Sequence, residues 1–352
     1  MSVNGDILLV GSVPLSSAEE VMRTCAQVLG NHLPSVPDGE TGDRSVWIVY
    51  QAYRVFHGHP DLITVQRPEP VDGAEQWMPT GFHNLWNFRV REGVDKVAFE
   101  DLKYAAAAKQ SYETFRKLRA SGTIPPGVRF QVCLPTPESI MVFFREPGQL
   151  ARIIPGYVDA MEKELQNLLQ AIPHEDLLIQ WDVCSEVLDI EGVFPWALTG
   201  EPGPEERYER TIGRLSSRIP DTVQVGYHLC YADLGHKHMK EPEDLGLVVQ
   251  MANRTSQVSG RRADYFHMPV PRNRTDEAYF APLKKLAIED ATLFLGLVHY
   301  SDGLDGARHR IDVARKFYGE FGISTECGFG RRPPEQVPKL LELHKNIVLS
   351  VL

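Results

Sequence analysis

Residues 157–182 read YVDAMEKELQNLLQAIPHEDLLIQWD and contain a helix pattern followed by a strand pattern. In residues 157–172 apolar side chains recur every three or four positions with charged side chains opposite them, which predicts an amphipathic helix. Residues 177–181 are a mostly apolar run, typical of a strand that is buried on both faces of a parallel sheet. The polar residue Asp182 follows that run directly. The stretch therefore predicts one unit of an α/β fold.

The same alternation runs along the whole chain. Apolar or β-branched runs predict buried parallel strands at residues 7–10, 128–132, 177–181, 223–227, 265–268, 293–298 and 323–325. Helix patterns occur at residues 18–29, 157–172, 205–217, 279–286, 307–321 and 334–343. An eighth strand pattern, at residues 32–36, is weakened by proline. Eight strands that alternate with helices predict an α/β protein with a (β/α)₈ TIM barrel fold.

Residues 57–97 interrupt this rhythm. They contain proline, glycine and aromatic residues without a clean period, which predicts a long insertion or lid after an early strand. No stretch has the composition of an interdomain linker, and no internal repeat is visible. We therefore expect residues 1–352 to form a single domain that carries residues 57–97 as an insertion.

The composition limits the classes of function. The chain of 352 residues is 43% hydrophobic and 24% charged, which is typical of a soluble globular protein with a large core. Its formal net charge of -10 argues against a nucleic-acid surface and favours a small-molecule substrate. The apolar run at residues 7–10 is too short to cross a membrane and lacks the pattern of an export signal. Five widely spaced cysteines do not resemble a disulfide framework, so a reducing, cytoplasmic setting is expected.

Polar residues at the ends of the predicted strands are the first candidates for a functional site, because the active sites of α/β barrels lie at the C-terminal ends of the strands. The residues at these positions are Ser12, Asp182, Glu186, His228, Cys230, His267, His299 and Cys327.

A metal site is one interpretation of the sulfur and imidazole groups in this set. His228 and Cys230 are two positions apart, so in an extended segment their side chains point to the same face. Cys327 follows the last predicted strand, which closes a barrel beside the first strand. Thiolates with an imidazole are typical zinc ligands, and three of them leave one position for a substrate or a fourth ligand. The alternative is that the His-x-Cys pair only packs in the core.

Two loops also carry candidate residues. His236 and His238 are either exposed loop histidines, or groups that bind an anionic substrate or supply a ligand if His267 does not. Asp38 and Glu40 flank a glycine in a turn-rich acidic loop, which is either an ordinary turn or a place where the backbone approaches a ligand closely.

The remaining candidates are acids, bases and arginines. Asp182 directly follows a buried strand, and a functional role is favoured because an unpaired buried carboxylate costs several kcal/mol. His299 is a candidate general acid, with a hydrogen-bonded strand-end histidine as the alternative. Its neighbour Tyr300 is a second candidate proton donor. Arg331 and Arg332 either steer an anionic group or lie on the surface.

Taken in chain order, several segments resemble the catalytic, C-terminal barrel of cobalamin-independent methionine synthase, within the uroporphyrinogen decarboxylase/methionine synthase-like superfamily. Gly-Ser-Val-Pro around Ser12 resembles the family's Gly-Ser-Phe-Pro opening, and Asp-Gly-Glu ending at Glu40 resembles its His-Gly-Glu loop. Ile-Gln-Trp-Asp ending at Asp182 resembles its Ile-Gln-Ile-Asp segment. The resemblance implies that Ser12 and Glu40 contact an amino-acid thiol and that Asp182 holds its amine.

The metal motifs take part in the same resemblance. Tyr-His-Leu-Cys-Tyr, which begins at Tyr227, resembles the family's Thr-His-Met-Cys-Tyr, and Glu-Cys-Gly around Cys327 resembles its Asp-Cys-Gly. The resemblance implies that His228, Cys230 and Cys327 are zinc ligands. Where the family has a glutamate ligand in Ile-Glu-Thr, this chain has Phe-His-Met, so His267 is the candidate fourth ligand.

Two further departures change the expected substrate. Val183 and Cys184 replace the glutamate and proline of the family's Asp-Glu-Pro, so amine recognition is expected to differ. The tryptophan that packs on folate in the family is absent near Met141. The resemblance then implies transfer of an alkyl (methyl) group to or from a small thiol or similar nucleophile without folate.

The sequence as a whole predicts a zinc-dependent alkyltransferase that acts on a small thiol or amino-acid-like substrate. A lyase or decarboxylase on the same barrel and a non-catalytic ligand-binding barrel are the alternatives. The candidate catalytic residues are Asp182, Glu186, His299 and Tyr300. The candidate substrate-binding residues are Ser12, Asp38, Glu40, Asp182, Tyr227 and His236. The candidate metal ligands are His228, Cys230, His267 and Cys327.

Overall fold

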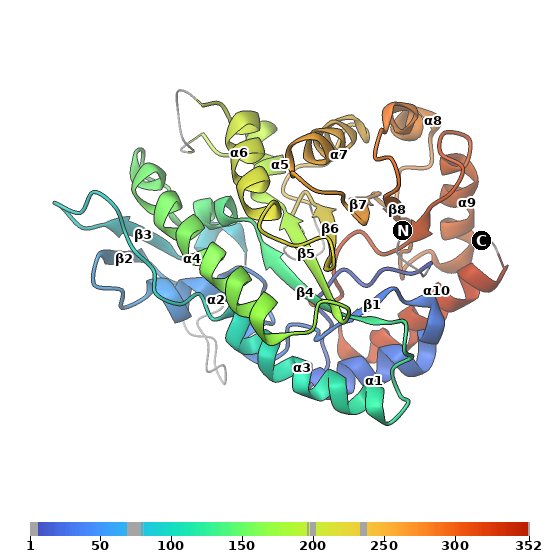
Figure 1. The fold of residues 1–352 in the computed structure, drawn as a ribbon. Coiled ribbons are helices and arrows are strands. Elements are labelled where there is room, and N and C mark those ends of the chain that lie inside the picture. Colours follow the sequence, from blue (N-terminus) through green and yellow to red (C-terminus); the bar gives the residue numbers. More distant parts are fainter. Residues whose placement is uncertain are drawn as a thin grey trace.

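A curled sheet of seven parallel strands forms the centre of the molecule (Figure 1). The computed structural model describes residues 6–68, 79, 81–195, 197, 202–232 and 238–350. In spatial order the strands are β1 (Ser35–Pro37), β4 (Arg129–Pro135), β5 (Leu177–Val183), β6 (Gln224–Leu229), β7 (Tyr265–Pro269), β8 (Thr292–Gly296) and β9 (Gly322–Ile323). Each predicted strand from residue 128 onward is therefore confirmed. The weak pattern at residues 32–36 is confirmed as β1.

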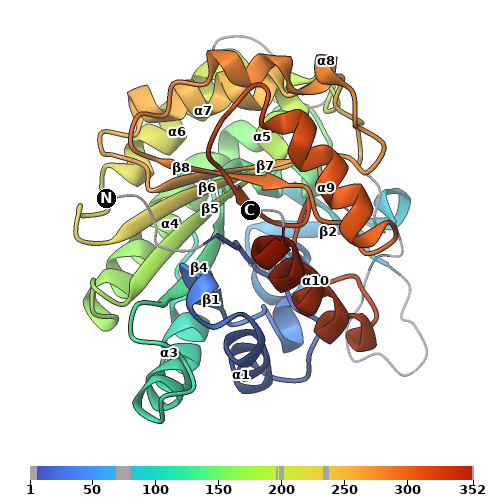
Figure 2. The ribbon, with the colours of Figure 1, turned by 90° about the vertical axis from the view of Figure 1, so that its right-hand side faces the viewer.

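Helices surround the outside of the curled sheet (Figure 2). They contact one another in the order α10, α1, α3, α4, α6 and α7. The helices are α1 (Ala18–Leu29), α2 (Val49–Gln51), α3 (Tyr104–Ala120), α4 (Gln149–Ala171), α5 (Ser185–Ile190), α6 (Pro204–Ser216), α7 (Gly246–Val258), α8 (Glu277–Phe280), α9 (Gly303–Ala314) and α10 (Val337–Ser350). Short helical turns are η1 (Gly30–His32), η2 (Gly42–Arg44), η3 (Ala52–Phe56), η4 (Phe82–Asn84), η5 (Pro137–Phe143), η6 (Ala281–Lys285) and η7 (Pro334–Gln336).

The opening segment differs from the prediction, because residues 7–10 form no strand ladder. Ile7 makes a single parallel bridge with Ile323 of β9, and on its other side its N–H donates to the carbonyl of His32. Side chains take the following carbonyls: Ser324 donates to Leu8 at 2.9 Å, and Gln131 donates to Leu9 at 2.9 Å. Side chains therefore take carbonyls that a strand ladder would use, and the sheet has seven strands where eight were expected.

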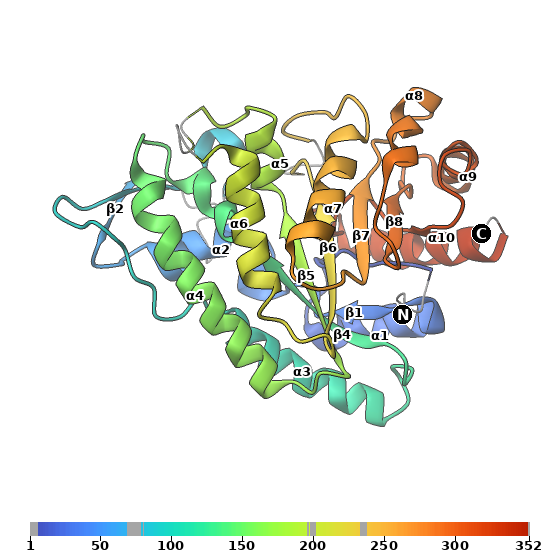
Figure 3. The same cartoon turned by 45° about the horizontal axis from the view of Figure 1, so that its top comes forward.

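The insertion contains more regular structure than its sequence indicates. Strands β2 (Leu62–Gln66) and β3 (Asn87–Val90) pair antiparallel in a separate two-stranded sheet beside α4 (Figure 3). Trp86 and Phe88 are buried in the same hydrophobic core as the large sheet. The insertion also contacts α4 at Gly156, where an added Cβ would lie 1.8 Å from the carbonyl oxygen of Val97. A glycine that resembles a helix breaker in the sequence is thus a point of close approach inside a longer helix.

Two strands that lead to the candidate site are buried along their whole length. Every residue of β5 is buried, and so is every residue of β7. Among the described residues, no helix is both long enough and apolar enough to span a bilayer.

Candidate metal centre and adjoining cavity

Three potential metal ligands converge at the C-terminal ends of β6 and β9. His228 lies in β6, Cys230 follows it by two positions, and Cys327 comes from the loop after β9. Their ligand atoms all lie within 4.8 Å of one another, and Cys327 Sγ is 3.8 Å from His228 Nε2. His228 is 3% exposed and Cys230 is 4% exposed. The structure thus brings Cys327 together with a His-x-Cys pair that lies about 100 residues earlier in the sequence.

The geometry of this group fits zinc. Zinc–sulfur bonds of about 2.3 Å and zinc–nitrogen bonds of about 2.0 Å at tetrahedral angles separate neighbouring ligand atoms by about 3.5–3.8 Å. A hydrogen bond from the Cys230 thiol, with help from Arg331 and His228, holds the pKa of Cys327 well below its ordinary value. Arg331 donates to Cys327 Sγ at 3.4 Å. These contacts favour the thiolate form of Cys327, which is the form in which a cysteine binds zinc.

His267 orients His228. Its Nδ1 lies 2.7 Å from His228 Nδ1, and its Nε2 lies 3.1 Å from the carbonyl oxygen of Thr325. A carbonyl only accepts, so His267 Nε2 carries the proton and its Nδ1 accepts one from His228. Burial and the neighbouring His228 lower the pKa of His267 well below its ordinary value, so its ring is neutral. Because His228 Nδ1 is engaged with His267, the nitrogen of His228 that can bind a metal is Nε2, which faces Cys327.

The predicted role of His267 as a fourth ligand does not match this geometry. Both of its ring nitrogens are engaged within the protein, and among the described residues the convergent group contains His228, Cys230 and Cys327 without it. A histidine that holds a ligand through its second nitrogen is a common support of zinc sites. The sequence position was correct for the centre, but the structure places this side chain behind His228.

A cavity opens beside the three ligands. Its lining includes His228, Cys230 and Cys327 as well as the polar groups of Ser12, Glu40 and Asp182. The walls between them are mainly apolar. Their side chains include Val46, Trp47, Val142, Phe143, Leu188 and Met239. The cavity therefore joins a soft metal site to a small group of carboxyls, with space for an apolar chain.

The carboxyl groups of Glu40 and Asp182 are both buried, and they lie close enough for the charge of Glu40 to act on Asp182. Burial raises the pKa of Glu40 to about 7, although the Ser12 hydroxyl donates to its carboxylate. Burial, and then the charge of Glu40, raises the pKa of Asp182 well above its ordinary value. Trp47 Nε1 and Gln180 Nε2 donate to the two Asp182 oxygens at 3.1 and 2.7 Å. A cation between these carboxyls would favour their ionised forms.

The loop that presents Glu40 is held by Asp38. Asp38 accepts hydrogen bonds from Arg44, from the Ser111 hydroxyl at 2.7 Å and from the Glu40 N–H at 3.0 Å. Glu40 has φ of 52°, a left-handed conformation that is costly for a residue other than glycine. Asp38 is thus used in bracing Glu40. Its predicted contact with substrate is not supported, because Asp38 does not line the cavity among the described residues.

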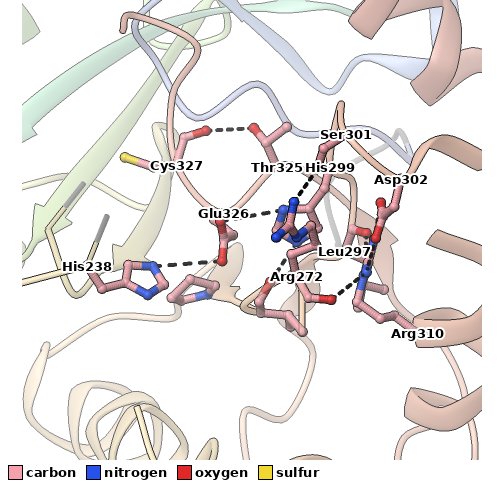
Figure 4. A network of polar contacts seen from close by, with 12 residues as sticks. His238, Arg272, Leu297, His299, Ser301, Asp302, Arg310, Thr325, Glu326 and Cys327 are labelled. Carbon is pink, nitrogen blue, oxygen red and sulfur yellow. Dashed lines mark hydrogen bonds and ion pairs between the residues drawn. The ribbon is translucent and has the colours of Figure 1, made fainter. Parts of the chain in front are cut away.

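His299 belongs to a polar network beside the loop that carries Glu326 and Cys327 (Figure 4). Glu326 lies between His238 Nε2 at 3.8 Å and His299 Nδ1 at 3.5 Å. His299 Nε2 lies 2.9 Å from the carbonyl oxygen of Val270. Burial and the charge of Arg310 lower the pKa of His299 to about 3, so it is neutral at physiological pH. The structure therefore places His299 beside the loop that carries Cys327, outside the described lining of the cavity.

The remaining predicted residues lie in different places. The Tyr227 hydroxyl donates to Ser216 of α6 at 2.9 Å, and Tyr227 is not among the described residues that line the cavity, so its contact with substrate stays a prediction. Adjacent strand residues face opposite sides, and His228 takes the inner one. Glu186 is buried on α5 and Tyr300 is partly buried. Neither is among the described residues that line the cavity. His236 lies outside the described residues.

Three residues that line the cavity or hold its carboxyls were not assigned roles from the sequence. Trp47 and Gln180 hold Asp182, and Cys184 lines the cavity next to the metal ligands. Gln180 was detectable, because it lies two positions before Asp182 on the same face of β5. Trp47 comes from an irregular segment with no periodic signal.

Comparisons with known proteins show which fold this is. No family model matches the chain, and no curated protein matches its sequence. A structure of a B12-independent methionine synthase from Shewanella sp. W3-18-1, in complex with selenomethionine, matches with a TM-score of 0.61 and 14% identity over 99% of this chain and 98% of that one. A putative vitamin-B12 independent methionine synthase from Listeria monocytogenes matches with a TM-score of 0.56 and 14% identity over 99% of both chains. The chain therefore has the fold of the proteins whose motifs it resembles.

Proposed function

We propose that this protein, which shares the fold of B12-independent methionine synthases, is a zinc enzyme that transfers an alkyl group to or from a small thiol. The convergence of His228, Cys230 and Cys327 at the edge of a cavity that also contains buried carboxyls carries the proposal. Zinc bound by these three residues would lower the pKa of a substrate thiol and make it a nucleophile at neutral pH.

The carboxyl end of the cavity suits the amine of an amino-acid-like substrate. Glu40 and Asp182 are buried with raised pKa values, and a bound ammonium group would favour the charged form of both. Ser12 and Trp47 hold the two carboxyls in place through hydrogen bonds. The Shewanella structure contains selenomethionine, an amino acid with a soft atom in its side chain. A ligand of that kind would bridge the carboxyl end and the sulfur end.

Asp182 is the candidate catalytic residue that this proposal keeps, because it lines the cavity. It would bind the substrate amine and so position the soft atom of the substrate at the metal site. His299 and Tyr300 have no place in the reaction that we propose. The alkyl donor is expected to be something other than a folate, since the tryptophan of the family's folate site has no counterpart near Met141.

The position of the first segment of the chain supports a barrel fold for this enzyme. We infer that residues 6–13 take the place of an eighth strand, because they are hydrogen-bonded to β9 through Ile323 and to the loop after β1 through Gly39. The chain would then form one barrel, with residues 57–97 inserted at the edge of its cavity. Leu85, from this insertion, lines the cavity.

Cobalt substitution tests the function directly. Cobalt(II) protein titrated with L-homocysteine is expected to gain thiolate-to-metal charge-transfer absorption that saturates near one equivalent. Asp182→Asn should weaken this binding about 10- to 100-fold by removing a buried charge-assisted contact worth about 1.5–3 kcal/mol. Metal binding without any spectral response to homocysteine or other small thiols would overturn the proposal.

A further inference from the structure

Cys184 stands in register with the metal ligands. Strands β5 and β6 pair with Asp182 opposite His228 and Val183 opposite Leu229. The ladder continues one step further, because the N–H of Cys230 donates to the carbonyl of Val183 at 2.9 Å. Paired positions on neighbouring parallel strands place their side chains on the same face. The register therefore places Cys184 beside Cys230.

The side chains follow that register. Cys184 lines the same cavity as Cys230 and Cys327, and it is 4% exposed. The thiols of Cys184 and Cys327 both interact with the thiol of Cys230. All of these cysteines are free. Cys184 therefore lies beside Cys230 in the lining of the cavity, next to the convergent group of His228, Cys230 and Cys327 but outside it in the metal-free protein.

We propose that Cys184 is the fourth ligand of the zinc site, which makes the centre a set of three cysteines and His228. This inference rests on the proposed function, since it concerns the same metal. The sequence points to His267 for that position, but His267 is engaged with His228 and Thr325. Zinc sites with three cysteines and one histidine are a common tetrahedral type, and the third thiolate also matches the preference of zinc for soft ligands.

A Cys184 ligand would also explain two departures from the family pattern together. A neutral histidine at position 267 removes the negative charge that a glutamate ligand would supply. A thiolate at Cys184 restores it, so the site keeps the same net charge. With zinc bound, a substrate thiol that entered the site would replace Cys184 as a ligand, and the proton of the substrate thiol would pass to the Cys184 sulfur. The ligand exchange is then neutral overall, with no charge left in the buried cavity.

X-ray absorption at the zinc edge tests this assignment in the intact protein. Wild type, purified with a reductant so that no disulfide forms, should show three sulfur ligands and one imidazole. Cys184→Ser should show two sulfur ligands. Cys25→Ala, which changes a buried cysteine of α1, should keep three. In the cobalt(II) protein, Cys184→Ser should lose about one third of the thiolate charge-transfer absorption, because three thiolates become two.

The outcomes separate this proposal from the one before it. Zinc with two sulfurs and two imidazoles in wild type would assign the fourth position to His267 and overturn the role of Cys184, while the zinc enzyme would stand. A count of two sulfur ligands in wild type that stays the same in Cys184→Ser would also overturn the role of Cys184. Protein that binds no zinc at all would overturn both proposals. The wild-type sulfur count decides the question even if Cys184→Ser fails to fold.

Discussion

The strand ends of β6 and β9 differ from those of β7 and β8 in how their polar groups are used. All four ends carry a residue typical of metal sites: His228, Cys327, His267 and His299. At β6 and β9 the donor atoms face one another across a cavity. At β7 and β8 both ring nitrogens of each histidine contact groups of the protein. Chemistry at a barrel strand end therefore depends on a free donor atom as well as on position.

Removing the imidazole at β6 should have the largest effect. If about 10–16 kcal/mol of zinc binding is shared by four ligands, each contributes about 4 kcal/mol at the upper end, or about 1,000-fold in affinity. We expect His228→Gln to lower zinc affinity by that order, measured by competition with a chromophoric chelator. An affinity within tenfold of wild type would remove His228 from the site.

Ionisation of Glu40 should have the next largest effect, on stability. Its pKa is raised from 4.5 to about 7, so the folded protein binds more protons than the unfolded chain between these values. Stability is then lost as pH rises from 4.5 to 7, by about 3 kcal/mol for a shift of this size. Metal-free Glu40→Gln should lose less stability than wild type over that window in urea unfolding. An exposed control, Glu113→Gln, should match wild type. Equal slopes for all three proteins would contradict the burial of Glu40.

Replacing the histidine at β7 should have a smaller effect on the metal than replacing the one at β6. Residues that hold a metal-binding histidine contribute about 10- to 100-fold in metal affinity. We expect His267→Leu to weaken zinc binding by this amount. His267→Gln should recover part of the loss, because its amide oxygen can accept from His228. A loss as large as that of His228→Gln, with no recovery by glutamine, would make His267 a ligand and erase the contrast between the two ends.

The histidine at β8 should have the smallest effect. His299 is neutral and hydrogen-bonded to Val270, and its nearest carboxylate is Glu326. His299→Gln should change zinc affinity by less than about threefold, in line with a loss of under 1 kcal/mol. Steady-state alkyl transfer should keep the same pH profile in this variant. A shifted acidic or basic limb would return His299 to the reaction as a proton donor.

The sequence predicted much of this arrangement because periodic patterns encode strands and their ends. The runs from β4 to β9 located His228, Cys230 and Cys327 correctly, and the chain order of motifs identified the fold. The prediction that Tyr227 contacts substrate did not take account of strand alternation. Because Tyr227 and His228 are adjacent in one strand, they face opposite sides, and Tyr227 contacts α6. The hydrogen bond between His228 and His267 depends on the distance between neighbouring strands, which no local pattern records.

Other features depended on contacts that are distant in the chain. The segment at residues 7–10 has a strand pattern, but side chains of Gln131 and Ser324 take the carbonyls that a ladder would use. Cys184 and Cys230 are adjacent only because β5 and β6 pair in one register out of several. A shift of one residue would turn Cys184 away from the cavity.

Zinc content by elemental analysis, after dialysis against a weak chelator, tests the central claim most directly. Wild type should retain about one zinc per chain, and Cys230→Ser and Cys327→Ser should each lose it, because each removes one soft ligand of a tetrahedral site. Wild type without zinc, even after reconstitution with the metal under reducing conditions, would contradict the account.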